Sequence, residues 1–402
     1  MSAPSAIHFA DRLNNVETSA IRDLFKLLGK PGIISFAGGF PDVALVDVDG
    51  IREATLAALA NEPGGALQYG ATEGYQPLRE QLTAFMAAKG VSQLAPENLM
   101  VTTGSQQALD LLGKTLVSPG DKVIVEGPTF LATIQCFRLY GAQLVSAPID
   151  GNGVQVDRLE QLIVEHRPKF VYLIPTFGNP SGATLTLERR KRILELAVKY
   201  QTLIVEDDPY GDLYFGEAPP PSLLALSDQV PGSRDWLVHC GSLSKTLSAG
   251  FRLGWMIAPA ELQAKAVMCK QFSDANSSTF AQATAAQYLK AGRMEGNLTR
   301  ARAVYAERAQ TMCDSLRAEL GDAISFVQPK GGLFVWARLT GAGGRETDAK
   351  AYSLRAIEQG VAFVPGVPFY CDLPDASALR LSFATSDVEK IREGVKRLAK
   401  AL

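Results

Sequence analysis

The sequence predicts an α/β protein, with a large domain on a doubly wound, mainly parallel sheet followed by a smaller α+β domain. Between about residues 98 and 260, short apolar runs rich in β-formers alternate with helical patterns. Near-continuous apolar strands are typical of parallel sheets covered on both faces. After about residue 290 a long polar helical pattern precedes short β-rich runs. The length of 402 residues suffices for one large and one smaller domain.

The predicted elements follow in three blocks. Residues 1–45 contain a short helix, SAIRDLFKLLGK, and the run ISFAGGFPD; they are too few to fold alone, so we expect an arm that packs on the small domain. In the large domain, residues 46–290, strands are predicted at 98–103, 122–127, 169–175, 202–208, 236–241 and 253–258, and helices at 105–116 and 187–201. In the small domain, residues 291–402, we expect a helix at about 293–320, β-rich runs at 324–339, 361–366 and 378–384, and a terminal amphipathic helix.

Composition excludes several classes of protein. Hydrophobic residues make up 47% and charged residues 20%, as in ordinary globular proteins, and the net charge of −2 favours neither nucleic acid nor a membrane as partner. No apolar run is long enough for a membrane span, and the N-terminus lacks the apolar core of a signal peptide. Five unclustered cysteines fit a reducing cytoplasm, and three histidines make a histidine-rich metal site improbable, so we expect no metal.

The stretch HCGSLSKTLSAGFRLGW, residues 239–255, places Lys245 among small hydroxyl residues. A nucleotide-binding P-loop requires glycine six residues and one residue before its lysine. Those positions hold His239 and Ser244, so the P-loop pattern is absent. Ser242, Ser244 and Arg252 still form an anion-binding feature, because arginine offers a planar and permanently charged fork.

Polar residues also follow three other predicted strands. Thr103-Gly104-Ser105-Gln106 opens a helix, where free N–H groups and the helix dipole suit a phosphate; taken alone, the motif is more often a simple serine N-cap. The run FGNPSG, residues 177–182, contains Asn179 but also reads as an ordinary turn. In IVEDDPY, residues 204–210, the three consecutive acids follow a strand and could simply be a solvated strand end. Asp208 could also be a cap.

In a doubly wound sheet, ligands gather at the carboxyl ends of the strands. A phosphate cradle, a carboxylate, an asparagine, a tyrosine and a lysine would meet there. These groups match the requirements of pyridoxal phosphate. A lysine forms a Schiff base with its aldehyde, a carboxylate keeps its pyridine nitrogen protonated, an aromatic ring stacks on it and a donor holds its phenolic oxygen.

The run SLSKTLSAGFRLGW, with NPSG before it and DDPY between them, resembles the fold-type I pyridoxal-phosphate enzymes of the class I/II aminotransferase family. The resemblance extends from SFAGGFPD to LRLSFA, nearly the whole chain. The departures are small: NPSG stands where NPTG is commoner, and Ala249 precedes Gly250 where proline is frequent. Neither departure removes a chemical group.

The resemblance implies a role for each matching residue. Lys245 would be the Schiff-base lysine and would carry the proton between the substrate Cα and the cofactor C4′. Asp207 would face the pyridine nitrogen, Asn179 and Tyr210 would bind the phenolic oxygen, and Phe130 would stack on the ring. The residues implied to cradle the phosphate are Ser105, Gln106, Ser242, Ser244 and Arg252.

The resemblance also implies a homodimer and a substrate clamp. Tyr69, in LQYGATEGY, would reach the phosphate of the neighbouring subunit, so that active sites are shared. Arg380, in LRLSF, would bind the substrate α-carboxylate bidentately, with Gly39 beside it, and Asn179 would also bind substrate.

The N-terminal run SAIRDLFKLLGKPGIISFAGGFPD and LQYGATEGYQPLRE resemble the 2-aminoadipate/aromatic aminotransferases, the LysN-like subgroup. In LysN-like enzymes an arginine on a mobile helix meets an acidic substrate side chain, and Arg22 occupies that place. An ordinary solvated charge, paired in sequence with Asp23, is the alternative. Our hypothesis is that Arg22 helps 2-aminoadipate or glutamate bind, while apolar substrates use the helix only as a lid.

The expected activity is ping-pong transfer of an α-amino group to a 2-oxo acid such as 2-oxoglutarate, with Lys245, Asp207 and Tyr210 as catalytic residues. The donor would be 2-aminoadipate or an aromatic or branched/aliphatic amino acid. A lyase or decarboxylase of the same fold would share the cofactor residues and is one alternative. A MocR-type regulator is disfavoured, since only about 35 residues precede SFAGGFPD and they contain no basic recognition helix.

Overall fold

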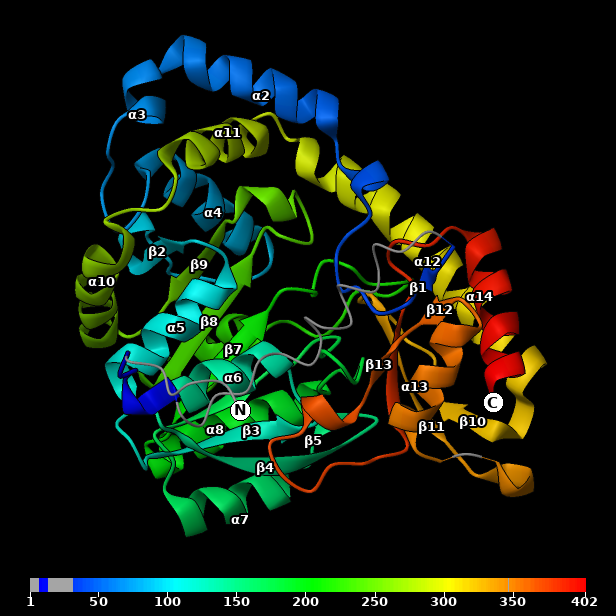
Figure 1. Cartoon of the computed structure of the whole chain (residues 1–402). Coiled ribbons are helices and arrows are strands. Elements are labelled where there is room, and N and C mark those ends of the chain that lie inside the picture. Colours follow the sequence, from blue (N-terminus) through cyan, green and yellow to red (C-terminus); the bar gives the residue numbers. More distant parts are fainter. Residues whose placement is uncertain (1–6, 14–31, 346) are drawn as a thin grey trace.

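A computed structural model describes residues 7–13, 32–345 and 347–402. The predicted helix at 19–30 lies outside these residues. A large sheet with helices on both faces forms one part of the molecule, and a smaller sheet with its own helices lies beside it (Figure 1). Among the described helices none is long and apolar enough to cross a membrane.

The large sheet has eight strands in the order β2-β9-β8-β7-β6-β3-β4-β5. In chain order these are β2 (Leu99–Thr102), β3 (Lys122–Gly127), β4 (Gln143–Asp150), β5 (Gly153–Val154), β6 (Phe170–Leu173), β7 (Leu203–Asp208), β8 (Leu237–Ser242) and β9 (Gly254–Ile257). Neighbours from β4 to β8 are parallel, whereas β9 runs antiparallel to β2 and β8. The predicted mainly parallel α/β fold is confirmed.

All six predicted strands are present, but β4 and β5 were not predicted. Strand β4 pairs with β3 on one side and only with the two residues of β5 on the other. This near-edge position leaves much of β4 partly exposed, so its sequence QLVSAPID carries polar residues and a proline. The strand prediction relied on continuous apolar runs, which are typical of strands buried on both faces, and so it missed β4.

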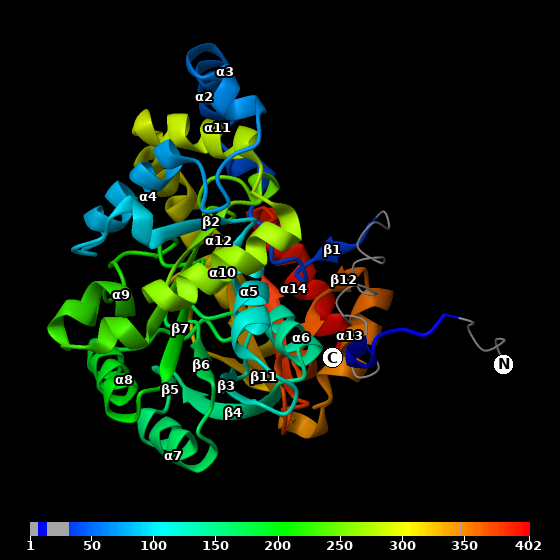
Figure 2. The same ribbon diagram turned by 90° about the vertical axis from the view of Figure 1, so that its left-hand side faces the viewer.

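Two sets of helices cover the large sheet (Figure 2). Helices α5 (Ser105–Leu116), α6 (Leu131–Leu139) and α10 (Ala260–Asp274) pack on one another on one face. Helices α7 (Val156–His166), α8 (Leu187–Tyr200) and α9 (Leu223–Leu226) pack in series on the other. Helices α2 (Val48–Asn61), α3 (Pro63–Leu67) and α4 (Gln76–Ala88) pack against α11 (Thr279–Lys290) at one end of the molecule.

The smaller sheet is antiparallel, in the order β10-β11-β14-β13. Its strands are β10 (Ile324–Phe326), β11 (Phe334–Leu339), β13 (Val364–Pro365) and β14 (Ala378–Ser382). Helices α12 (Arg293–Leu320), α13 (Ala349–Glu358) and α14 (Val388–Ala401) accompany it, and β1 (Ile34–Ser35) pairs in parallel with β12 (Val361–Ala362). We propose the division into an arm at 1–45, a large domain at 46–290 and a small domain at 291–402, supported by these separate sheets and by the β1–β12 pairing.

The terminal helix α14 shows how sequence dictates local structure here. Asp387 precedes it and accepts a hydrogen bond from the Lys390 backbone N–H, which satisfies one of the free donors at the helix start. Ile391, Val395 and Leu398 then recur at helical spacing and are fully buried. Charged residues occupy most of the remaining positions, so the amphipathic pattern specifies both the helix and the face that packs on the small domain.

Strands β8 and β9 pack tightly where Gly241 lies opposite Trp255. A Cβ atom on Gly241 would lie 2.1 Å from the Trp255 indole, well inside van der Waals contact. We predict that Gly241→Ala destabilises the protein by about 1–3 kcal/mol, because the indole must shift in a filled core. Urea unfolding midpoints measure this.

Gly296→Ala is the matched control, because this exposed glycine in α12 has open space around it. We expect it to leave stability unchanged or to raise it by roughly 0.5–1 kcal/mol, since alanine favours a helix interior. Equal midpoints for Gly241→Ala and the wild type would contradict the packing argument.

Candidate active site

The predicted site residues lie mainly where strands of the large sheet end. Asp207 is the penultimate residue of β7, Asn179 follows β6, and Ser105 begins α5 just after β2. Lys245 lies three residues beyond the end of β8, in the turn that follows this strand. Arg380 comes from β14 of the smaller sheet. The site therefore draws on both sheets.

The three acids at the end of β7 have three different functions. Successive strand residues face opposite sides of a sheet. Glu206 is buried on the α9 side, where it accepts from the Leu223 backbone N–H at 2.6 Å and contacts His239 Nδ1 at 2.8 Å. Asp208 accepts from the Gly211 N–H at 3.0 Å and caps the following turn, as one interpretation of the sequence proposed. Only Asp207 faces the α5–α6 side.

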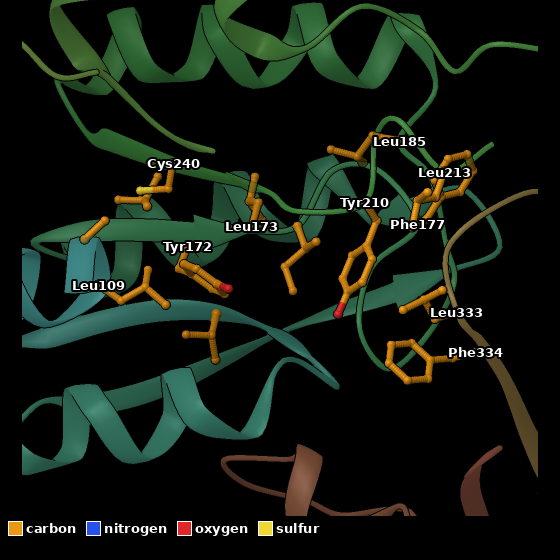
Figure 3. Close-up of a cluster of buried hydrophobic side chains, with 14 of the residues drawn as sticks. Leu109, Tyr172, Leu173, Phe177, Leu185, Tyr210, Leu213, Cys240, Leu333 and Phe334 are labelled. Atoms are coloured by element: carbon orange, nitrogen blue, oxygen red, sulfur yellow. The ribbon is translucent and has the colours of Figure 1, made fainter. Parts of the chain in front are cut away.

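Asp207 is almost completely buried and only half satisfied. Its Oδ2 accepts a hydrogen bond from the Tyr172 hydroxyl at 2.7 Å, whereas Oδ1 has no partner among the described residues. Burial raises the pKa of Asp207 from 3.8 to about 7, although the Tyr172 hydroxyl opposes this shift. Figure 3 shows Tyr172 within a buried cluster that also contains Tyr210 and Phe334. A donor placed at Oδ1 would satisfy the carboxylate.

Lys245 is the nucleophile candidate, and its amine is kept from full protonation. Its Nζ donates to the Gly39 carbonyl at 2.9 Å. Burial, together with the positive charges of Arg252 and Arg380, lowers the pKa of Lys245 to about 8. A lysine with this pKa provides a substantial fraction of neutral amine near neutral pH, which nucleophilic attack on a carbonyl requires.

Arg380 is joined to Asn179 and Tyr210. One guanidinium nitrogen donates to Asn179 Oδ1 at 2.8 Å and another to the Ala37 carbonyl at 2.8 Å, while Nε has no described partner. Asn179 Nδ2 in turn donates to the Tyr210 hydroxyl at 3.4 Å. The guanidinium also lies 4.2 Å from the centre of the Phe334 ring. Arg380 is buried, and none of the described carboxylates forms an ion pair with it.

An anion cradle surrounds the start of α5. None of the described side chains caps this helix, which leaves N–H groups at its start available. A Cβ on Gly104 would lie 2.7 Å from the Arg252 guanidinium, and a Cβ on Gly254 would lie 2.7 Å from the Ser105 nitrogen. Both positions need glycine for this close approach. Arg252 also contacts Ser244 Oγ at 3.4 Å, and Ser242 Oγ accepts from the Ser244 N–H.

Other predicted residues are less closely connected. Gln106 lies in the first turn of α5 but is exposed, and Phe130 is half-buried at the start of α6. Tyr69 is 86% exposed, and its backbone N–H donates to Gln68 Oε1 at 2.9 Å. Gly39 lies beside the clamp, since a Cβ there would be 3.9 Å from Arg380. Arg22 lies outside the described residues.

Sequence reasoning missed Tyr172, which holds Asp207. The only sequence signal is a single polar-tipped residue in the apolar strand FVYL, and this does not identify a partner on the next strand. The strand register identifies the partner. Tyr172 pairs with Val205, and Val205 and Asp207 are two residues apart, so the side chains of Tyr172 and Asp207 lie on the same face of the sheet.

These groups fit pyridoxal phosphate. The unpaired Asp207 oxygen matches a protonated ring nitrogen, the uncapped helix start with Arg252 matches a phosphate, and the Lys245 amine matches an aldehyde. Asn179 and Tyr210 offer hydrogen bonds for a phenolic oxygen between them. The unpartnered Nε of Arg380 offers a further donor for a carboxylate.

Comparison with known proteins gives the family. Residues 32–398 match the family described as "Aminotransferase class I and II". The chain is 40% identical to the 2-aminoadipate transaminase of Thermus thermophilus, over 98% of this chain and 96% of the relative. It is 37% identical to aromatic-amino-acid aminotransferase 1 of Thermococcus litoralis, over 98% and 94%.

Structure agrees with sequence. The crystal structure of LysN, the α-aminoadipate aminotransferase from Thermus thermophilus in complex with N-(5'-phosphopyridoxyl)-L-leucine, superposes with a TM-score of 0.89. It is 39% identical, and the match covers 98% of this chain and 97% of that one. The resemblance to the LysN-like subgroup and the predicted cofactor are confirmed. The chain belongs to the class I and II aminotransferases and is a pyridoxal-phosphate-dependent enzyme of fold type I.

Proposed function

We propose that this aminotransferase moves the α-amino group of 2-aminoadipate, or of an aromatic or aliphatic amino acid, to a 2-oxo acid such as 2-oxoglutarate. The donor classes are supported by the names of the similar enzymes. One observation in the chain itself carries the proposal: Lys245 and Arg380 bind carbonyls two residues apart, at Gly39 and Ala37. An α-carboxylate bound to Arg380 would thus bring the substrate amino group and Cα near the lysine amine.

When bound, the cofactor supplies an electron sink that makes the substrate Cα–H acidic enough to transfer its proton. Lys245 would hold the cofactor aldehyde carbon, and as a free amine would carry the Cα proton. Asp207, oriented by Tyr172, would hold the ring nitrogen in its protonated form. Asn179 and Tyr210 would bind the phenolic oxygen, and Phe130 would cover the ring. Ser105, Gln106, Ser242, Ser244 and Arg252 would bind the phosphate.

A homodimer with shared active sites is part of the proposal. It is supported by the exposure of large apolar side chains: Leu67 at the end of α3 is 68%, Tyr69 just after it 86%, and Phe272 in α10 82% exposed. Large apolar side chains that together form an exposed patch mark protein–protein interaction sites. We also place the enzyme in the cytoplasm, because its five cysteines are all free.

A half-reaction screen tests the function. Each amino acid is mixed with purified enzyme carrying its cofactor and no oxo acid, and the cofactor absorbance and the released product are followed. We predict that 2-aminoadipate or aromatic amino acids change the absorbance and release the matching 2-oxo acid. Release of ammonia or carbon dioxide instead would identify a lyase or decarboxylase.

Lys245→Ala should lose the absorbance of the lysine-bound cofactor and lower turnover by at least about 10⁴-fold, because covalent holding and proton transfer both depend on this amine. Lys245→Arg keeps the charge without the nucleophile and should behave in the same way. Substantial turnover by either variant would refute the assignment of Lys245.

Asp207 should make the cofactor-free protein sensitive to pH. Its pKa is raised from 3.8 to about 7, so between these values the native carboxyl keeps a proton that the unfolded chain has lost. Stability contributed by this group is therefore greatest below pH 3.8 and is lost as the pH rises toward 7. We predict that wild type loses stability relative to Asp207→Asn between about pH 4 and about pH 7. Urea unfolding of both cofactor-free proteins measures this; a difference independent of pH would exclude it.

Hybrid dimers test the shared site. Tyr69→Phe and Lys245→Ala are each expected to be impaired alone, Tyr69→Phe through weaker cofactor binding. In a mixed dimer, one of the two sites would combine Lys245 of the first variant with Tyr69 of the second and would be intact. We predict that mixing, after mild unfolding and refolding, restores cofactor affinity and activity to about half of wild type in such hybrids. Strictly additive behaviour of the two variants would contradict sharing.

A further inference from the structure

Arg190 in α8 is a fully buried arginine outside the catalytic groups. Its Nε donates to the Leu185 carbonyl at 3.0 Å, and one terminal nitrogen donates to the Pro175 carbonyl and to Thr176 Oγ1, both at 2.8 Å. The other terminal nitrogen donates to the Pro221 carbonyl at 3.2 Å. One guanidinium therefore gathers acceptors from three separate segments of the chain.

All four acceptors are uncharged. None of the described carboxylates forms an ion pair with Arg190; the carboxylates of Glu206 and Asp208 influence it only at longer range, and burial lowers its pKa. A guanidinium without an opposite charge is costly to bury. This cost is offset only where the fixed, planar array of N–H donors organises several backbone groups at once, which lysine's single point charge does not do.

The segments that Arg190 gathers include the two ends of one loop. Pro175 and Thr176 start the loop after β6, and Leu185 ends it before α8. The Leu185 N–H donates back to the Pro175 carbonyl at 2.8 Å and closes the base. Inside the loop Phe177 adopts a φ of 50°, a conformation that costs free energy for a bulky residue and persists only when the surroundings impose it.

The tip of this loop carries Asn179. Its amide oxygen accepts from Arg380 at 2.8 Å, and its amide nitrogen donates to the Tyr210 hydroxyl at 3.4 Å. A shift of the loop base would therefore displace a side chain that contacts both the proposed carboxylate clamp and the proposed ligand of the phenolic oxygen.

We propose that Arg190 is a positioning residue for transamination: by fixing both ends of the 175–185 loop, it holds the Asn179 amide between Arg380 and Tyr210. Arg190 touches neither substrate nor cofactor, and acts through Asn179. The proposal rests on the function proposed above for Asn179 and Arg380, and it extends that function to a residue on the far side of the sheet.

Arg190→Met tests the proposal, with Arg189→Met as the matched control. Arg189 is the adjacent residue of the same helix, but its guanidinium pairs with Asp150 at 2.7 Å and donates to the Gly153 and Val154 carbonyls of β5 rather than to carbonyls of the 175–185 loop. For Arg190→Met we expect the KM for the amino acid to rise about tenfold and the affinity of the apoprotein for pyridoxal phosphate to fall about tenfold, with Arg189→Met within about twofold of wild type on both. Arg190→Lys should recover part of the loss. A lower melting temperature with unchanged KM and cofactor affinity would show a purely structural role and overturn the proposal.

A double-mutant cycle with Asn179→Ala tests whether Arg190 acts through Asn179. If Arg190 acts through Asn179, Arg190→Met should add less than about twofold to KM in the Asn179→Ala background. Independent, multiplying effects would overturn the proposal.

Thr176→Val gives a milder perturbation should Arg190→Met not fold. It removes a single acceptor of Arg190, and we expect a smaller KM increase that Asn179→Ala again suppresses. No KM increase, or one that survives in the Asn179→Ala background, would overturn the proposal. The affinity of the apoprotein for pyridoxal phosphate is measured without substrate. This measurement therefore still tests the role of Arg190 if the half-reaction screen shows that the proposed substrates are wrong.

Discussion

The site depends on the burial of Arg380 without a carboxylate among its described neighbours. Its guanidinium donates to two neutral acceptors, Asn179 Oδ1 and the Ala37 carbonyl. Two aromatic rings, Phe334 and Phe369, lie against it. A charge held in this way favours an anion that arrives from solution, because the desolvation cost has been met during folding. Burial lowers the pKa of Lys245, and the charges of Arg252 and Arg380 lower it further. The proposed substrate clamp thus also contributes to activation of the amine.

Sheet geometry explains why these groups meet. Strand β7 presents Glu206 to one face and Asp207 to the other, so adjacent acids serve different layers. On the α9 side Glu206 binds backbone N–H groups and His239. On the α5–α6 side Asp207 is held by Tyr172 from the neighbouring parallel strand. The parallel arrangement places the ends of β6, β7 and β8 at one edge, and the smaller sheet contributes Arg380 across from them.

Sequence predicted much of this, for identifiable reasons. Strand 122–127 and helices 105–116 and 293–320 agree with the structure residue by residue, because their burial patterns are strong and local. Lys245 and Arg252 were recognisable because seven residues separate them in one motif. Tyr172 and Arg190 were not, because their functions depend on partners brought together by folding. Tyr172 is 35 residues from Asp207. The loop acceptors of Arg190 are only 5 to 15 residues away, but the path of the loop that brings them around one guanidinium has no signal in the sequence pattern.

Burial moves Lys245 and Asp207 toward their neutral forms, with opposite consequences. For Lys245 the neutral amine is the reactive species, so a pKa of about 8 prepares it directly. For Asp207, with a pKa of about 7, the neutral form is unsuited to holding a protonated ring nitrogen, so this carboxyl requires a cationic partner to return to its ionised state. The Tyr172 hydrogen bond lowers the pKa of Asp207 and so favours the carboxylate form. Fold alone therefore activates the lysine, whereas the aspartate reaches its functional charge only together with the cofactor that it binds.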